Sequence, residues 1–310
     1  MSDPAGAVEI RGPEPLAGRV RAWLSEGRLA SPRDSAIDVI EAPAEPNQLA
    51  TPDHHRDGVR VWVARGPNDP IRLHWDDWHT AAEIRPDGTA RLTIAPPVAA
   101  DIEHHAPWIL VTAIALLFRR GGLFHLHAAA AVGPGETGWV LVGNSASGKS
   151  TTAALMARRG WHVATDDIAF LQRDSRFGVV VRGFRSRLAL RAGGHALLGA
   201  EGGTPLGRRE KIGYWAEELG GAWRASVAPD YLVFPEVRGD RTTFEPIRRG
   251  EAIRGLFDRS FWPLIDPAGT EEQLALLKDL AARAQCFRAS LAPDLFEAPG
   301  LLADFVPQAS

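Results

Sequence analysis

The segment that most limits how this chain can fold is a glycine-rich turn between an apolar run and a helical run. Its residues, GNSASGKS at 143–150, match the pattern G-x-x-x-x-G-K-[ST] at every fixed position. The apolar run GWVLV at 138–142 predicts a strand before the turn, and residues 150–159 predict a helix after it. A strand, a turn and a helix in this order predict an α/β fold.

Each residue type in the turn suits the binding of an anion. The glycines let the backbone direct its N–H groups inward at a helix N-terminus, where they form a nest for phosphate. Lys149 brings a compact positive charge to the β- and γ-phosphates, and Ser150 offers a hydroxyl to Mg²⁺, with Thr151 as a second candidate. We therefore expect ATP and Mg²⁺ to bind at Gly143, Asn144, Ser145, Ala146, Ser147, Gly148, Lys149, Ser150 and Thr151. The alternative is a turn that only caps a helix.

Two adjacent aspartates, Asp166 and Asp167, end the apolar stretch WHVAT at 161–165, which follows the predicted helix. In parallel α/β units the carboxyl ends of the strands line one crevice, so we expect both carboxylates beside the phosphates held by Lys149. One would bind Mg²⁺ together with Ser150, and the other would accept a proton from an attacking hydroxyl. The sequence leaves open which aspartate has which role. The alternative is an aspartate pair that only ends a turn or caps the next helix.

The chain divides into three parts by its sequence pattern. Residues 1–57 are rich in Pro, Ala and Asp, and they predict loops with one amphipathic helix. Residues 58–122 predict a small antiparallel sheet, with a hairpin turn at Pro86-Asp87-Gly88, and then a buried helix at 106–120. Residues 123–310 predict the nucleotide-binding domain.

Composition excludes several classes of partner. A formal net charge of −3 and a pI near 6.4 give no electrostatic reason for a nucleic-acid partner. The single cysteine, Cys286, excludes an intrachain disulfide and a cysteine-based zinc site. The longest apolar stretch, at 108–118, is shorter than the roughly 20 residues that cross a bilayer, and the N-terminus lacks a signal-peptide pattern. We expect a cytoplasmic protein that binds neither nucleic acid nor membrane, and the sequence leaves open whether it forms a homo-oligomer.

The stretch 123–171 resembles the kinase domain of HPr kinase/phosphorylase, whose P-loop fold is shared with phosphoenolpyruvate carboxykinase. The matching segments are LHAAAAV at 126–132, WVLVGNSASGKST at 139–151, ALMARRG at 154–160 and HVATDD at 162–167. The resemblance continues more loosely to CFRASLAPDL at 286–295. The first hundred residues look more like divergent kinase relatives that are found beside peptide-modification genes, including those that phosphorylate precursor peptides of the lasso type.

The resemblance implies a role for several residues. His127 matches a strand histidine near the transferred phosphate, and Ser145 matches the loop serine. Asn144 stands where HPr kinase commonly has Asp. Asp166 and Asp167 match the metal-binding and base pair of the family. The activity that the resemblance implies is transfer of the ATP γ-phosphoryl group to a hydroxyl, with a serine of a peptide or protein as acceptor.

One position departs from the family pattern. The family has a carboxylate associated with the metal in its EIRG segment, whereas VVRG at 180–183 has Val180 there. The departure argues against the classical metal ligation of the family, against phosphorylase activity and against HPr as the substrate. It also motivates one alternative, a nucleotide-binding accessory protein without catalytic activity. A second alternative is a kinase of a small-molecule hydroxyl.

A phosphoryl-transfer site needs positive charge beyond the lysine of the turn. Arg208, Arg209 and Lys211 lie in a polar segment that could close over the site, and the alternative is a solvated loop. Arg185 and Arg187 are further candidates.

Two further features are candidate binding sites, one for a metal ion and one for a peptide. His125 and His127 are two residues apart on a predicted strand and are expected to point to one face. They would form a metal pair, or else one would pack in the core and the other would form a hydrogen bond, and the resemblance favours His127 as the active-site residue. A peptide acceptor could bind to an edge of the sheet predicted at 58–97 or to the basic segment 207–211.

Overall fold

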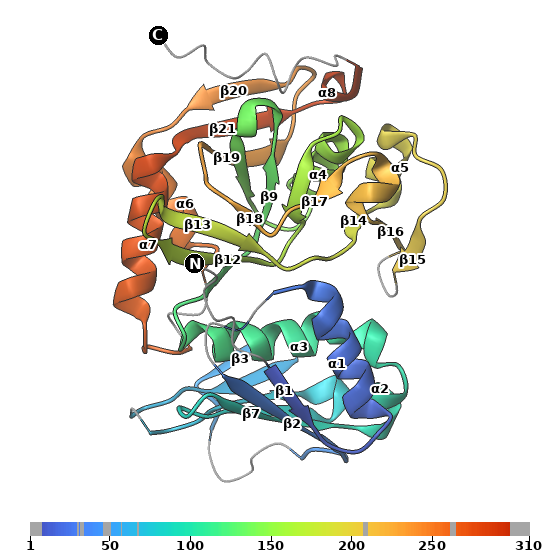
Figure 1. Ribbon diagram of the computed structural model, residues 1–310, viewed down its shortest axis with the longest axis vertical. Helices are drawn as coiled ribbons and strands as arrows, with labels where there is room; N and C mark the ends of the chain where they lie inside the picture. The colour runs from blue at the N-terminus through green and yellow to red at the C-terminus, as the bar shows by residue number, and fades with distance from the viewer. Residues whose placement is uncertain are drawn as a thin grey trace. The chain divides into compact units, whose positions relative to one another are not determined.

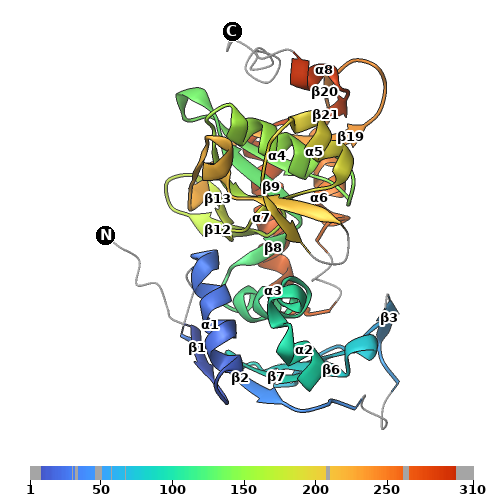
Figure 2. The same cartoon turned by 90° about the vertical axis from the view of Figure 1, so that its right-hand side faces the viewer.

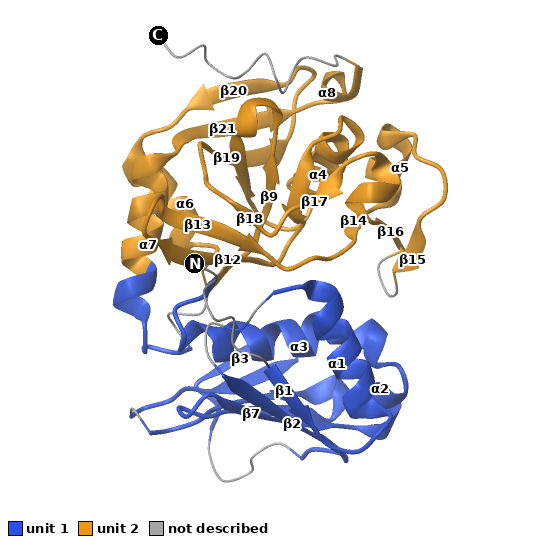
Figure 3. Ribbon diagram, in the orientation of Figure 1, with its two compact units in different colours: residues 1–124, 261–273 blue, residues 125–260, 274–310 orange. Residues whose placement is uncertain are grey.

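The computed structural model describes residues 8–29, 31, 34–45, 51–56, 58–66, 68–206, 210–260 and 265–297 (Figure 1, Figure 2). The chain forms two compact units (Figure 3): unit 1 contains residues 1–124 and 261–273, and unit 2 contains residues 125–260 and 274–310. The described residues form four sheets and eight α-helices, so the fold is mixed α/β. The return of residues 265–273 to unit 1 was not predicted from the sequence.

Unit 1 contains a seven-stranded sheet. Its strands lie in the order β1 (Val8–Arg11), β2 (Ser35–Glu41), β7 (Thr89–Ile94), β6 (Thr80–Ile84), β5 (Ile71–Trp75), β4 (Val59–Trp62) and β3 (His54–Arg56). The strands from β3 to β7 form an antiparallel meander, and the expected hairpin turn at 86–88 joins β6 to β7. β1 and β2 pair in parallel, and β2 also pairs in parallel with β7.

The sheet of unit 1 differs from the expectation at both edges. The sequence predicted no strand in residues 1–57, because this part is rich in prolines and aspartates, and β1 has only four residues. Ile37 and Val39 of β2 are nevertheless buried, so packing with β7 decides the conformation. The edges of the sheet are β1 and β3, so the strands within 58–97 lie inside it. Among the described residues, the range 58–97, in which we expected a peptide-binding edge, therefore contains no edge strand.

Three helices lie on one face of this sheet (Figure 1, Figure 2). They are α1 (Leu16–Gly27), α2 (Pro96–Ala100) and α3 (Ile102–Arg119). Leu16, Ala17 and Val20 of α1 are fully buried, and the apolar run of α3 is buried over most of its length. Burial of these apolar faces against the sheet gives unit 1 a core of its own. Among the residues that the structure describes, no helix has the length and apolar character needed to cross a membrane.

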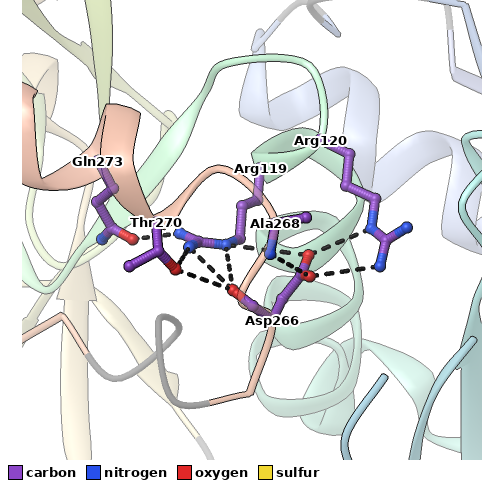
Figure 4. A network of polar contacts seen from close by, with 6 residues as sticks. All are labelled: Arg119, Arg120, Asp266, Ala268, Thr270 and Gln273. Carbon is purple, nitrogen blue, oxygen red and sulfur yellow. Dashed lines mark hydrogen bonds and ion pairs between the residues drawn. The ribbon is translucent and has the colours of Figure 1, made fainter. Parts of the chain in front are cut away.

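A buried polar network joins the end of α3 to residues 266–273 within unit 1 (Figure 4). Asp266 is fully buried, and its carboxylate accepts hydrogen bonds from Arg120 at 3.2 and 3.3 Å. Arg119 donates to the carbonyl oxygen of Asp266 at 3.0 and 3.2 Å, to the Thr270 hydroxyl at 3.0 Å, and to the Gln273 side-chain oxygen. Burial lowers the pKa of Arg119 to about 10, so the guanidinium stays charged at neutral pH. The two guanidinium charges are therefore compensated by the Asp266 carboxylate and by neutral oxygen acceptors around Arg119.

We predict that Asp266→Ala lowers the free energy of unfolding of unit 1 by about 3–5 kcal/mol, because it leaves two buried guanidinium groups without their carboxylate. Asp279→Ala is the matched control, since Asp279 pairs with Arg173 and the two side chains are 45% and 49% exposed. That variant should cost less than about 1 kcal/mol. Urea unfolding of both variants measures the difference, and equal midpoints would contradict a stabilising role for the network.

Unit 2 contains three sheets. The main sheet has the order β17 (Ala222–Trp223), β11 (His162–Thr165), β9 (Ala128–Val132), β10 (Gly138–Val142), β19 (Tyr231–Val237), β21 (Gln285–Leu291) and β20 (Thr243–Pro246). A second sheet has the order β18 (Ser226–Val227), β13 (Gly178–Gly183), β12 (Ala169–Asp174) and β8 (Phe124–Leu126). The third has the order β14 (Leu188–Leu190), β16 (Lys211–Tyr214) and β15 (Thr204–Leu206). The helices are α4 (Lys149–Arg158), α5 (Ala192–Leu198), α6 (Arg249–Phe257), α7 (Thr270–Arg283), whose first residues belong to unit 1, and α8 (Asp294–Glu297).

The core of unit 2 lies between the main sheet and α4. β9 has the sequence AAAAV and is buried along its whole length between β10 and β11. Ala129 and Ala131 belong to the same buried cluster as Ala153 and Ala154 of α4. Small side chains on both sides let the helix backbone approach the sheet closely. Alanine favours helices over strands, so tertiary packing determines the conformation of β9.

Candidate functional site

Strand direction brings three predicted segments to one edge of the main sheet. β10 and β11 both pair antiparallel with β9, which lies between them, so β10 and β11 run in the same direction. The end of β10 leads into the glycine-rich loop, and the end of β11 leads to Asp166 and Asp167. The start of β9 lies at this same edge, because Ala128 pairs with Val142. His127, which directly precedes β9, therefore lies between the loop and the aspartates.

The loop between β10 and α4 has the backbone that its glycines allow. Gly148 has φ +98°, in the left-handed region that glycine adopts without strain. A Cβ on Gly143 would lie 2.5 Å from the Ser147 hydroxyl oxygen, so a side chain at 143 would push the loop open. Ala146 has φ +67°, which is uncommon for a residue with a side chain. The loop thus keeps a local conformation that an alanine adopts only at a cost in free energy.

Lys149 is the buried positive charge of the site, with only 4% of its surface exposed. Its ammonium donates to the carbonyl oxygens of Gly143 at 2.7 Å and Asn144 at 3.1 Å. A third contact reaches His127 Nε2 at 3.2 Å, and Asp167 Oδ1 lies 3.8 Å away. Burial lowers the pKa of Lys149, and the two aspartates oppose that shift. Three acceptors around one ammonium match its three donors.

His127 is the link between Lys149 and Asp167. Burial and the nearby charges of Lys149, Lys211 and Arg259 lower the pKa of His127 to about 4, so the imidazole is neutral at pH 7. Its Nδ1 lies 3.2 Å from Asp167 Oδ1. Because Nε2 accepts from Lys149, the proton of the neutral ring belongs on Nδ1, where it is donated to Asp167.

The two aspartates have different surroundings. Asp166 is 2% exposed, whereas the side chain of Asp167 is 48% exposed. Burial and the neighbouring Asp167 raise the pKa of Asp166 to about 6, while the Ala189 N–H, the Ser150 hydroxyl and Lys149 favour its ionised form. The Ala189 N–H donates to Asp166 Oδ2 at 2.9 Å. Burial raises the pKa of Asp167 as well, so the two carboxylates differ in degree: Asp166 is the more closed and Asp167 the more exposed.

Two buried oxygen atoms of the site have no hydrogen-bond partner among the described residues. They are the Ser147 hydroxyl and Asp166 Oδ1. Buried polar atoms are costly when unpaired, so these two atoms suit a polar ligand. No group of three or more His, Cys, Asp or Glu that could hold a metal occurs in the described part of the chain. Mg²⁺ does not require such a group, because it commonly binds to one or two carboxylates and to substrate phosphates. The oxygen atoms of Asp166 and Ser150 are therefore of the kind that Mg²⁺ binds.

The expectation that His125 and His127 share one face of a strand is wrong. His125 lies in β8 of the second sheet, and the chain passes to the main sheet at His127. His125 packs edge-on against Phe170 with a ring separation of 5.6 Å. Burial lowers the pKa of His125 to about 3, so it is neutral. The two histidines therefore belong to different environments.

Other predicted residues lie in the following places. The Thr151 hydroxyl packs against Gly194 of α5, since a Cβ on that glycine would lie 2.6 Å from it. Val180 is buried in β13 and pairs with Gln172 of β12. Arg208 and Arg209 lie outside the described residues. Lys211, in β16, is close enough to the site for its charge to act on His127, Lys149 and Asp167.

Sequence reasoning missed three groups near the site. The Ala189 N–H is a main-chain donor, so no residue type could have indicated it. Arg259 follows α6, about a hundred residues after the loop, and no local pattern links them. Arg191 lies within hydrogen-bonding distance of Ser145, at 3.5 Å. Its proximity to the basic pair at 185 and 187 was the only available signal.

Comparisons with known proteins add no assignment to this geometry. The chain matches no model of a known protein family, and no curated protein matches it significantly.

We predict that the raised pKa of Asp166 makes the protein less stable as the pH rises from about 4 to about 6. The folded state holds a proton on Asp166 up to about pH 6, whereas an unfolded aspartate releases it near 3.8. The folded state therefore binds more protons in this window, and the free energy of unfolding falls with rising pH.

Asp166→Asn removes this titration. The variant should be more stable than the wild type at pH 7 by roughly 1–3 kcal/mol, with no such gain at pH 4. Urea unfolding at both pH values, without added metal, measures the effect. The exposed Asp279→Asn variant is the control. A gain that is the same at both pH values would contradict the prediction.

Proposed function

We propose that this protein is an ATP-dependent kinase of the HPr kinase-like type that transfers the γ-phosphoryl group to a hydroxyl. The acceptor is a serine of a peptide or protein. The observation that carries the proposal is that a buried ammonium, a phosphate-type loop and two unlike carboxylates lie at one sheet edge. Transfer of a phosphoryl group requires these parts: a cradle for phosphates, positive charge, a site for Mg²⁺ and a base.

The loop and Lys149 would hold the triphosphate. The N–H groups at the start of α4 face the anion, with the helix dipole adding to the attraction. Lys149 is already held at the loop by the carbonyl oxygens of Gly143 and Asn144. A phosphate oxygen can then accept a hydrogen bond from the ammonium in place of one of its three present acceptors, with little loss of side-chain freedom. The unpartnered Ser147 hydroxyl supplies a further donor.

The geometry supports a division of roles between the aspartates. Asp166, with the adjacent Ser150 hydroxyl, would hold Mg²⁺, which when bound neutralises phosphate charge. Asp167 is open to solvent and receives a hydrogen bond from His127, which fixes its orientation. The acceptor oxygen attacks the γ-phosphorus, and its proton passes to Asp167. The bond between the γ-phosphorus and the bridging oxygen breaks, and ADP leaves.

Lys149→Ala should weaken the binding of ATP–Mg²⁺ about 10- to 100-fold, because a contact between a charged donor and phosphate contributes roughly 1.5–3 kcal/mol. Lys278→Ala is the matched control, since Lys278 is an exposed lysine of α7. Equilibrium binding of ATP–Mg²⁺ measures both. Equal affinity in the two variants would overturn nucleotide binding at the loop.

Asp167→Asn should retain ATP–Mg²⁺ binding and lose phosphoryl transfer by about 100-fold or more, because general-base catalysis contributes about that much. The assay uses labelled ATP and Mg²⁺ with serine-containing peptides and, separately, small alcohols. Transfer to small alcohols alone would make the protein a small-molecule kinase. ATP binding without transfer to any acceptor would favour an inactive accessory protein, the alternative that Val180 motivates.

A further inference from the structure

Three arginines lie in the segment 185–191, and two of them contact an aromatic ring and a carboxylate. The guanidinium of Arg185 lies 4.0 Å from the centre of the Trp215 ring, and that of Arg187 lies 4.6 Å from it. Arg185 also pairs with Glu217, and Arg187 with Glu218, each at 3.4 Å. Both guanidinium groups therefore have an aromatic ring and a carboxylate as protein partners.

Arg191 differs from these two arginines. Its Nη2 lies 3.5 Å from the Ser145 hydroxyl oxygen, at the long limit of a hydrogen bond. Among the described residues, no carboxylate lies within ion-pair distance of Arg191. A guanidinium has five N–H donors, so this one contact leaves most of its binding capacity unused. With respect to the described residues, a positive charge without a carboxylate partner thus lies beside the glycine-rich loop.

The position of Arg191 is set by the packing of α5 on α4. Gly194 lies directly against Thr151, because a Cβ at 194 would come within 2.6 Å of the Thr151 hydroxyl. The carbonyl oxygen of Leu198, at the other end of α5, accepts a hydrogen bond from Arg158 of α4. His195 of α5 is linked to the Tyr214 hydroxyl of β16 at 3.2 Å.

α5 is therefore attached at its centre, through Gly194 and His195, and at its C-terminal end, through Leu198. Arg191 directly precedes this helix. The packing of α5 on α4 therefore positions the backbone of Arg191 near the loop, in addition to the contact that its side chain makes with Ser145.

We propose that Arg191 is an additional phosphate-binding residue, which contacts the phosphates held by the loop together with Lys149. This inference rests on the proposed function. Arginine binds phosphate through two parallel N–H donors, whereas lysine acts as a point charge, so the two residues are complementary. The Ser145 hydroxyl, which Arg191 contacts in the structure, would be exchanged for phosphate oxygens, which are stronger acceptors.

The test compares Arg191→Ala, Arg191→Lys and the control Arg173→Ala in the full chain. Arg173 is an exposed arginine of β12 that pairs with Asp279, so its removal changes the net charge equally. The probes are ATP–Mg²⁺, inorganic tripolyphosphate–Mg²⁺ and adenosine, each measured by equilibrium binding. Arg191→Ala should weaken ATP and tripolyphosphate about 10- to 100-fold and leave any adenosine binding unchanged. Arg191→Lys should recover part of the loss, because it keeps the charge.

The outcomes separate this inference from the proposed function. Equal affinities of Arg191→Ala and Arg173→Ala for both phosphate probes, with Lys149→Ala weakened, would overturn the inference and leave the proposed function standing. Binding of tripolyphosphate but not ATP, with loss in Arg191→Ala, would support the inference and overturn the proposed function. A wild-type protein that binds neither probe would overturn both. Weaker binding of all three probes by Arg191→Ala would show damage to the fold and would also overturn the inference.

Discussion

An ammonium group that is buried against a sheet edge needs acceptors on every side, and Lys149 finds them on separate segments of the chain. Two are carbonyl oxygens of the loop that follows β10, and one is the imidazole nitrogen of His127 before β9. A buried charge without such partners would cost several kcal/mol. The loop must therefore curl back over the lysine, and His127 must stay neutral to accept from it. The arrangement of the site follows from this single buried charge.

The two aspartates at this edge of the sheet have different chemical environments. Asp166 lies in a closed environment with one oxygen unpaired, and burial raises its pKa to about 6. Asp167, the next residue along the chain, is half exposed and has partners of both kinds, a neutral imidazole and an ammonium. Successive residues after a strand point in different directions, so one turn of the backbone is enough to separate them. Such a difference in environment is how paired carboxylates acquire different roles.

Sequence reasoning was strongest where local chemistry decides the structure. The strand, turn and helix around Lys149 follow from glycine positions and apolar runs, and the structure has β10, the loop and α4 there. Sequence-based prediction was weaker where contacts between segments far apart in the chain determine the structure. β1 and β2 were missed because they become strands through pairing with distant segments, β2 with β7 and β1 with β2. The change of sheet at His127 cannot be seen in the run of residues from 123 to 132. The contact of Arg191 with Ser145 depends on how α5 packs on α4, which no spacing reveals.

The hydrogen bond from Ala189 to Asp166 has a consequence for how the site would respond to substitution. Its donor belongs to the main chain, so exchange of the Ala189 side chain leaves the bond in place. A survey of side-chain replacements would therefore record position 189 as tolerant, apart from effects of size. Proline alone removes the donor, and it would alter the acidity of a carboxylate 23 positions earlier in the chain. Position 189 would thus accept most side chains, although its main-chain N–H acts directly on the charge of Asp166.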